Sequence, residues 1–224
     1  MTDAHCHVTG GDPAIREFLI GRDFVGVHPW ECLGLSTAVE CSRLLSEVRA
    51  ALEAGPSLGV GEIGLDRLKS REISPQMRET FEAQLKLAIE FSRPAVLHGA
   101  KCWGQVVKAV QGTCEQARGH RKGAFLFHGF SRSDGLIPEI VALGGYISVG
   151  PAVLNDHAVN YRELVKRIPA DRLLLETDRT VENAADCPSV ATVAAEVAKL
   201  RGVSVIELER MTDENAEEFL GSRR

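Results

Sequence analysis

Two histidines stand two positions apart near the start of the chain, in the segment Asp3-Ala4-His5-Cys6-His7. In an extended strand, residues i and i+2 point to the same face, so His5 and His7 would project together, close enough to bind one metal ion. The alternative is that one is a surface histidine and the other forms a hydrogen bond in the core. Further metal-competent residues elsewhere in the chain favour the metal site.

Other metal-competent side chains follow short apolar runs. Glu62 follows Leu58–Gly61, His98 follows Ala95–Leu97, His128 follows Phe125–Phe127, and Asp178 comes shortly after Leu173–Leu175. Each run predicts a buried strand, and the C-terminal ends of the strands of a (β/α) barrel converge on one mouth, where active sites lie. We therefore expect six side chains to meet at that mouth: His5, His7, Glu62, His98, His128 and Asp178.

This set of ligands suits two divalent metal ions. We predict that the ions share the carboxylate of Glu62, with His5, His7 and Asp178 on one ion and His98 and His128 on the other. Such ions lie about 3.5–4 Å apart and activate a water. Glu62 and Asp178 are the predicted catalytic residues, and Asp178 positions the water and takes its proton. Imidazole ligands favour Zn, Mn, Fe or Ni, although Mg stays open.

Each predicted ligand also has a structural alternative. A single histidine at the end of a strand is more often structural, and Asp178 could cap the following turn. Glu62 is harder to explain in this way, because carboxylates are rarely buried unless they are paired or bound to metal. The coincidence of all these residues with strand ends favours the metal centre. Its excess positive charge would attract an anionic substrate such as a phosphodiester.

Short apolar runs and segments of helical period alternate along the chain, and they would position these residues. The predicted strands are Thr2–Val8, Phe24–His28, Ser57–Ile63, Pro94–His98, Ala124–His128, Gly145–Val149 and Arg172–Thr177. The predicted helices are Ser36–Ala54, one that follows the Ser74 cap, Gly104–Gln116, Asp134–Leu143, Ala158–Arg167, Ser189–Arg201, Ser204–Arg210 and Asp213–Leu220. This order predicts an α/β fold, either a (β/α) barrel or an open doubly wound sheet. The chain contains neither G-x-G-x-x-G after the first strand nor a P-loop motif, which argues against the nucleotide-binding forms of the open sheet.

The composition is that of one globular domain spanning residues 1–224, with 44% hydrophobic residues and a net charge of -5. This charge argues against a basic surface wrapped along duplex DNA, but it does not exclude a nuclease whose metal ions supply positive charge. The sequence has no apolar run of membrane-spanning length, no signal-peptide pattern and no C-x-x-C motif. We expect a cytoplasmic protein with reduced thiols, no membrane contact and no obligatory protein partner.

The block Gly61-Glu62-Ile63-Gly64-Leu65-Asp66 is similar to the signature of the TatD-related metal-dependent hydrolases, which belong to the amidohydrolase superfamily. Other blocks resemble that family in the same order: Asp3–His7, Gly26–Trp30, Val96–His98, Phe127–Ser131 and Glu176–Asp178. The resemblance implies a TIM-type barrel and a metal-dependent phosphodiesterase. It further implies a deoxyribonuclease, often a 3′ exonuclease, acting on single-stranded or end-frayed DNA or on a smaller phosphodiester.

The resemblance assigns the same six residues as metal ligands and places His28 at the rim, near substrate phosphate. The alternative for His28 is a turn histidine fixed before Pro29. Trp30 and Trp103 follow strand-end blocks and could stack on a base or pack over the rim.

Three departures from the family pattern concern the fold and the substrate. The segment between His7 and Phe24 is too short for the usual helix, strand and second helix, so we expect a shortened barrel. Its second unit would be missing or vestigial, with a strand remnant at Arg16–Ile20, which leaves one side of the mouth more open. The family pattern has an arginine two residues after its histidine, but this chain reads His98-Gly99-Ala100-Lys101. Lys101 could substitute for that arginine, but it would supply only a point charge to phosphate. After Asp178, the chain has Arg179-Thr180 where the family pattern has Ala-Pro. Arg179 would either contact phosphate or lie at the surface without a role, and the sequence favours neither alternative.

Three other functions are weighed against a nuclease. The first is a superfamily hydrolase acting on a small ester, lactone, cyclic amide or phosphotriester. Such sites commonly use a carboxylated lysine as the bridge, whereas the bridging position here offers Glu62. The second is a scaffold that retains structural metals without turnover. The third is an α/β binding module in which the six residues have no common role.

Overall fold

The computed structural model describes residues 1–224 except 36, 56, 118–123 and 222–224. The strands are β1 (Thr2–Cys6), β2 (Arg16–Leu19), β3 (Phe24–Val25), β4 (Gly59–Asp66), β5 (Ala95–Ala100), β6 (Phe125–Phe127), β7 (Gly145–Val149) and β8 (Leu173–Leu175). The α-helices are α1 (Ala38–Ala54), α2 (Pro75–Glu90), α3 (Trp103–Gln116), α4 (Ile137–Ala142), α5 (Val159–Arg167), α6 (Val190–Arg201) and α7 (Val205–Leu220). Ser36, the predicted start of the first helix, lies outside the described residues.

The strands follow one another in barrel order. β3 to β8 form a parallel six-stranded sheet in sequence order, and β1 pairs with β2 in a separate parallel sheet. An isolated parallel bridge between Ile20 and Phe24 joins β2 to β3. On the other side, the N–H of Asp178, just beyond β8, donates to the carbonyl oxygen of His5 in β1 over 3.0 Å. A few hydrogen bonds, among them those from the N–H groups of His7 and Val8 to the carbonyl oxygen of Arg179, thus take the place of full ladders at both joints of the β1–β2 pair.

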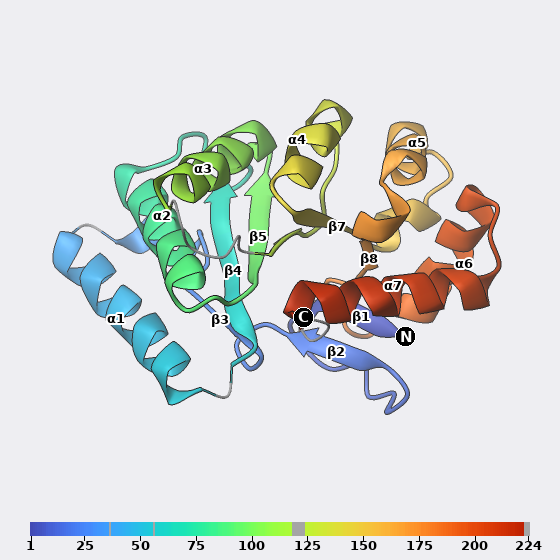
Figure 1. Ribbon diagram of the computed structural model, residues 1–224, viewed down its shortest axis with the longest axis horizontal. Coiled ribbons are helices and arrows are strands. Elements are labelled where there is room, and N and C mark those ends of the chain that lie inside the picture. The colour runs from blue at the N-terminus through green and yellow to red at the C-terminus, as the bar shows by residue number, and fades with distance from the viewer. Residues whose placement is uncertain (36, 56, 118–123, 222–224) are drawn as a thin grey trace.

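The second unit of the barrel is vestigial, as the sequence predicts. Residues 7–23 contain the short strand β2 but neither of the two helices expected in the family. The strand remnant predicted at Arg16–Ile20 corresponds to β2 at Arg16–Leu19. No helix from this segment covers β1 and β2. Instead, α7 packs against β1, and it crosses beside β1 and β2 in Figure 1.

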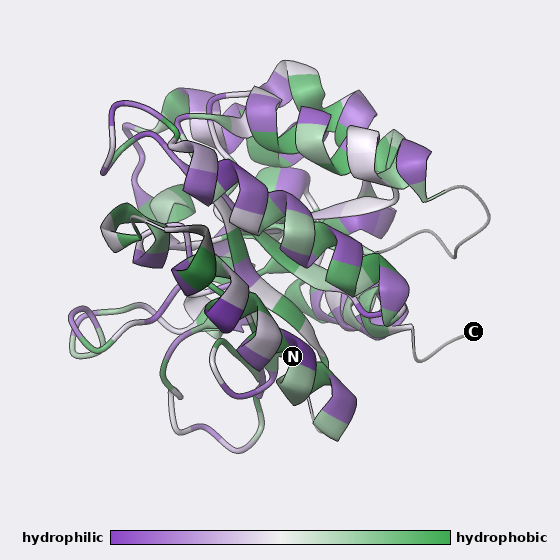
Figure 2. Ribbon diagram, turned by 90° about the vertical axis from the view of Figure 1, so that its left-hand side faces the viewer, coloured by the Kyte–Doolittle hydropathy of each residue, from purple (hydrophilic) through white to green (hydrophobic). Residues whose placement is uncertain are grey.

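Two layers of apolar side chains hold the strands. Residues such as Val60, Leu97 and Phe127 point outward into the larger cluster, which the helices cover. Val96 and Leu126 point to the opposite side and belong to a smaller inner cluster. Figure 2 shows this distribution as mostly hydrophobic strands in the middle of the molecule, surrounded by helices that carry both hydrophilic and hydrophobic residues. Alternation along each strand therefore determines which residues can enter the barrel mouth.

The last helix differs from the prediction and seals the inner cluster. Two short helices, Ser204–Arg210 and Asp213–Leu220, were expected, but α7 runs without interruption from Val205 to Leu220. The prediction was wrong because Met211-Thr212 contains no glycine or proline to stop a helix, and Thr212 is buried instead of capping a new one. The ring of Phe219 packs against the rings of Phe18, Phe24 and Tyr146, from β2, β3 and β7.

Replacement of Phe219 by alanine is therefore expected to lower the free energy of unfolding by about 3–5 kcal/mol, because it opens a cavity among strands from different parts of the barrel. Urea denaturation would measure the change. Ile206→Ala is the control, since Ile206 lies on the same helix with 80% of its surface exposed and should change stability by less than about 0.5 kcal/mol. Equal losses in the two variants would contradict the packing role of Phe219.

Within the described residues, no helix is long and apolar enough to cross a membrane. The cysteines are all free thiols, as expected: Cys6, Cys32, Cys41, Cys102, Cys114 and Cys187.

Candidate metal centre

An irregularity in β4 brings Glu62 to the centre of the barrel mouth. Val60 pairs with Ala95 of β5, but Ile63 pairs with Leu97, so β4 contains one extra residue at this point. Such a bulge re-aims side chains, and bulges are frequent beside active sites. A little further on, a Cβ atom at Gly64 would lie 2.0 Å from the carbonyl oxygen of His98, so only glycine allows β4 and β5 to approach this closely.

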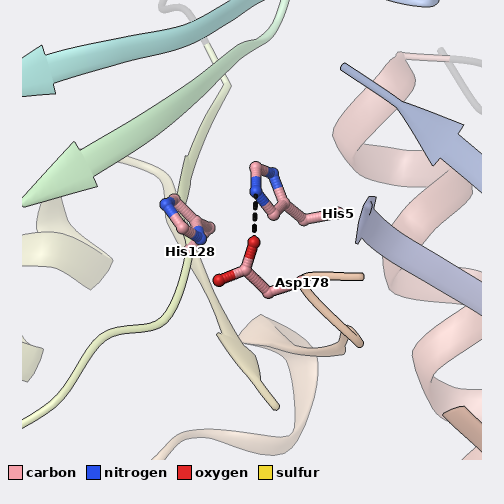
Figure 3. A group of neighbouring side chains, drawn as sticks. All are labelled: His5, His128 and Asp178. Atoms are coloured by element: carbon pink, nitrogen blue, oxygen red, sulfur yellow. Dashed lines mark ion pairs between the residues drawn. The ribbon is translucent and has the colours of Figure 1, made fainter. Parts of the chain in front are cut away.

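One carboxylate oxygen of Glu62 faces His5 of β1 and His7, which directly follows that strand. Its Oε2 lies 3.5 Å from Nε2 of His5 and 3.3 Å from Nε2 of His7. The Oδ1 atom of Asp178 lies 3.4 Å from the same atom of His5 and 3.6 Å from that of His7. We call these four residues the first cluster. Figure 3 shows His5 and Asp178 pointing toward one another beside His128.

The other carboxylate oxygen of Glu62 faces a second group of histidines. Its Oε1 lies 2.6 Å from Nδ1 of His98 and 2.7 Å from Nε2 of His128. These two ring nitrogens are 3.3 Å apart. The imidazole of His128 also stacks on that of His5, with 3.9 Å between ring centroids. We call Glu62, His98 and His128 the second cluster.

The first cluster has the shape of a metal site. Ligand atoms about 2.1 Å from one tetrahedral centre lie about 3.4 Å from one another, close to the four separations just given. His5 Nε2 is buried and has no hydrogen-bond partner among the described residues. A buried polar atom without a partner is costly, and a cation between Nε2 and the carboxylates would remove that cost. The donor set of imidazoles and carboxylates therefore fits a transition-metal ion.

The protonation equilibria of these groups are strongly shifted. Burial, reinforced by the charge of His128, lowers the pKa of His5 to about 4, so its ring is neutral. Burial alone would lower the pKa of His128 and raise that of Glu62. Their attraction outweighs burial, raising the pKa of His128 to about 10 and holding the pKa of Glu62 well below its usual range. Because a proton and a metal ion compete for the same imidazole nitrogen, metal binding to the second cluster should release protons.

Several carboxylates to which the sequence analysis assigns no role form hydrogen bonds with the residues of the two clusters or with the segments that carry them. Asp66 Oδ2 accepts a hydrogen bond from Nε2 of His98 over 3.2 Å and another from the indole N–H of Trp30 over 2.6 Å. The bond leaves Nδ1 of His98 free to face Glu62, which fixes the tautomer of the ring. Burial would raise the pKa of Asp66, but these hydrogen bonds outweigh it and the pKa is strongly lowered.

Asp3 and Glu176 act in the same way for the other strands. Asp3 accepts hydrogen bonds from the N–H and the hydroxyl of Thr177, at 3.0 and 2.6 Å, and so ties β1 to the segment that carries Asp178. Glu176 accepts hydrogen bonds from Gly129 N–H and the hydroxyl of Ser148 beside the ring of His128. Burial raises the pKa of Asp3 to about 6 and that of Glu176 to about 7. All three supporting carboxylates stand in the motif blocks, but only the folded chain shows what each one holds.

Replacement of Asp66 by asparagine should weaken metal binding about 10–100-fold. The amide oxygen would stay with the backbone N–H groups of Leu68 and Lys69, so the amide nitrogen, which cannot accept a hydrogen bond, would face the ring of His98. Calorimetric titration with Mn²⁺ or Zn²⁺ would measure the change. The matched control is Asp12→Asn, which makes the same chemical change in an exposed loop. Equal affinities in the Asp66 variant and the unaltered protein would contradict the orienting role.

The three residues predicted to bind substrate lie in different settings. His28 enters the site: its Nε2 lies 3.5 Å from Glu62 Oε1, and its Nδ1 accepts a hydrogen bond from the N–H of Trp30. Lys101 lies at the rim of a pocket that His98 also lines. Arg179 is occupied elsewhere, since its guanidinium donates to the carbonyl oxygens of Ala184 and Cys187. The described contacts thus give Arg179 the role of bracing the loop after β8, and they lend no support to a phosphate contact.

The two tryptophans are placed differently as well. Trp103 is buried against the rings of Phe127 and Phe130, so it packs beneath the rim. Trp30 remains 46% exposed and lines a pocket of about 670 Å³, together with His7, His28 and Glu62. We call it the central pocket. Ile20 and Gly21 of the shortened segment also line it, so the vestigial unit forms part of the wall of the mouth.

A parallel α/β barrel with histidines and carboxylates gathered at the C-terminal ends of its strands defines the class of barrel metal-dependent hydrolases. Residues 21–221 match the family model described as TatD related DNase. The chain therefore belongs to the TatD-related DNase family, and it is a metal-dependent hydrolase.

Individual relatives agree with this assignment. The chain is 30% identical over 216 residues to the metal-dependent hydrolase YabD of Bacillus subtilis, covering 93% of this chain and 81% of that protein. It is 29% identical over 209 residues to a protein of Klebsiella pneumoniae named 3'-5' ssDNA/RNA exonuclease TatD, covering 88% of this chain and 75% of the relative. In fold, it resembles the crystal structure of YjjV, a TatD homologue from Escherichia coli. That comparison has a TM-score of 0.74 and 23% identity, and it covers 93% of this chain and 78% of the other.

Proposed function

We propose that this protein is a two-metal phosphodiester hydrolase that removes nucleotides from the 3′ end of single-stranded DNA. The observation that carries the proposal is the position of Glu62, whose two carboxylate oxygens face two different groups of histidines. A carboxylate placed in this way suits a bridge between two cations. The names of the exonuclease relatives supply the substrate class.

The ligands of the first ion would be His5, His7 and Asp178, and those of the second would be His98 and His128. When bound, two divalent ions would lower the pKa of a water and neutralise charge on the phosphoryl oxygens. The imidazole set favours Zn, Mn, Fe or Ni over Mg.

The chain's own residues would orient the reacting groups. The side chain of Asp178 is half exposed at the mouth and has a lowered pKa, because its attraction to the neighbouring rings of His5 and His128 outweighs the burial that would raise it. It is therefore ionised, and it can position a water and accept its proton. His28 accepts a hydrogen bond at Nδ1, so its Nε2 carries a proton and can donate to a phosphoryl oxygen. The exposed ring of Trp30 offers a surface for a base.

A single-stranded oligonucleotide labelled at its 5′ end tests the proposal. With added Mn²⁺ or Zn²⁺, we expect a ladder of products shortened from the 3′ end, and slower digestion of a blunt duplex. Parallel assays use bis-p-nitrophenyl phosphate and a lactone panel. Hydrolysis of lactones without hydrolysis of any phosphodiester would overturn the proposal and favour the small-ester alternative. Bound metal without any turnover would favour the scaffold.

A smaller phosphodiester is the second candidate substrate, and one observation favours it. The family pattern has an arginine two residues after its histidine, whereas this chain has Ala100 two residues after His98. A bidentate contact with phosphate is therefore lost at that position. Comparison of kcat/KM between a dinucleotide and longer oligonucleotides separates the two: a rise with length indicates a DNA exonuclease, and a fall indicates the smaller substrate.

A further inference from the structure

The pockets at the barrel mouth differ in charge. Among the described residues, the central pocket is lined by four carboxylates, Glu31, Glu62, Asp178 and Glu182, and by no lysine or arginine. A neighbouring pocket of about 610 Å³ is lined by Lys101 and Arg132, and Asp178 is the only carboxylate that lines it in the part of the chain that the structure describes. We call this the cationic pocket. It also reaches His98 and His128, so it opens directly onto the second cluster.

Lys101 and Arg132 occupy similar positions in the barrel. Lys101 directly follows β5, which carries His98, and Arg132 lies four residues after His128. Both side chains are exposed, and neither forms an ion pair within the part of the chain that the structure describes. Both residues have the left-handed backbone conformation, with φ of 57° and 58°. This conformation is uncommon for residues other than glycine, and such strain clusters at ligand-binding sites.

A helix end adds to the positive potential of the cationic pocket. α3 begins at Trp103, and Cys102, Trp103 and Gly104 all line the pocket. No side chain caps this helix, so its N-terminus, with the positive end of the helix dipole, borders the pocket. On a protein of net charge -5, two unpaired cations and a helix N-terminus thus converge beside the metal centre.

We propose that the cationic pocket binds a second phosphate of the substrate, one link to the 5′ side of the phosphate that is cleaved. This inference rests on the proposed function, because an enzyme that removes the 3′-terminal nucleotide acts on a strand that continues only in the 5′ direction. The terminal nucleoside then occupies the central pocket, where Trp30 is exposed. The preferred substrate class is an oligonucleotide with at least one further phosphate, in place of an isolated phosphodiester.

The second phosphate is remote from the reacting atoms. Its contacts with Lys101 and Arg132 are made in the ground state and the transition state alike, so they should act mainly on KM and little on kcat. Charge-assisted contacts of this kind justify an expected preference of about tenfold.

The experiment compares a thymidine dinucleotide with and without a 5′-phosphate, using the metal-loaded enzyme. For the unaltered protein, we expect kcat/KM to be about tenfold higher with the 5′-phosphate, and the difference to lie in KM. In the double variant Lys101→Gln, Arg132→Gln, this ratio should fall below about twofold. The control is Lys86→Gln, Lys108→Gln, which removes the same charge from exposed positions of α2 and α3 and should keep the full ratio.

A ratio near one in the unaltered protein, or an unchanged ratio in the double variant, would overturn the second-phosphate site and leave the proposed function standing. If neither dinucleotide nor bis-p-nitrophenyl phosphate is hydrolysed, the proposed function itself fails, and the site falls with it. Thermal unfolding of all variants would show that the substitutions leave the fold intact.

Discussion

Glu62→Gln is expected to reduce kcat for phosphodiester hydrolysis by about 10³-fold or more, the scale known for removal of a group that stabilises charge in a transition state. Glutamine has nearly the same shape as glutamate, but it lacks the charge that two cations would share. Its amide nitrogen would also face one group of histidines in place of an oxygen. Initial rates on an oligonucleotide and on bis-p-nitrophenyl phosphate would measure the loss.

The fold should survive this substitution. Glu62 is buried among histidines and not within the apolar clusters, so an isosteric replacement opens no cavity. The control is Glu79→Gln, an exposed glutamate on α2 that should retain full activity. A Glu62→Gln enzyme with unaltered turnover would contradict the bridging role. If the Glu62→Gln protein fails to fold, Glu62→Asp would replace it, because aspartate keeps the charge but shortens the reach of the carboxylate.

Removal of metal is expected to abolish hydrolysis and to lower the melting temperature by about 5–10 °C. An ion present at 100 times its dissociation constant stabilises the fold by about 2.7 kcal/mol, and each kcal/mol shifts the melting temperature of a chain of this size by about 2–4 °C. The ligands come from strands that are far apart in the sequence, so an ion would join β1 to β4 and to the segment after β8. Dialysis against a chelator, followed by thermal unfolding, tests both effects.

Re-addition of single ions distinguishes the candidate metals. Zn²⁺, Mn²⁺, Fe²⁺ or Ni²⁺ should restore activity and melting temperature together, and Mg²⁺ should do so less well because it prefers oxygen ligands. Glu62→Gln should respond weakly to every ion. A chelated protein that keeps both its activity and its melting temperature would rule out the metal centre.

The sequence was sufficient to predict the fold class and the convergence of the six side chains. His98 and His128 follow apolar runs that can only be buried strands, and parallel strands present their C-terminal ends at one edge of a barrel. The vestigial second unit was predictable from the shortness of the segment between His7 and Phe24 when it is set against the family pattern. The assignment of the six residues as metal ligands stays a proposal.

Other features depend on contacts that no sequence pattern specifies. Asp66 supports His98 only because the register of β4 on β5 pairs His98 with Gly64, two residues before Asp66, so that the two side chains can meet diagonally across the strands. The direction taken by Arg179 follows from the backbone after β8, where Asp178 has a φ of 49°, and the sequence did not indicate that left-handed conformation. The break predicted within α7 depended on local propensity, and tertiary burial of Thr212 overrode it.

The contacts of β1 and β2 with the C-terminal part of the chain have a consequence for the order of folding. Asp3 bonds to Thr177 across 174 positions, Thr2 bonds to Asp213 across 211, and Phe18 packs on Phe219. Contacts that close such long loops must overcome the entropic cost of loop closure before they contribute stability. They therefore form late and slow the folding of the chain. Because β1 carries His5 and leads directly into His7, the first cluster should be assembled only in the final step of refolding, and uptake of the first ion should report when the native state has been reached.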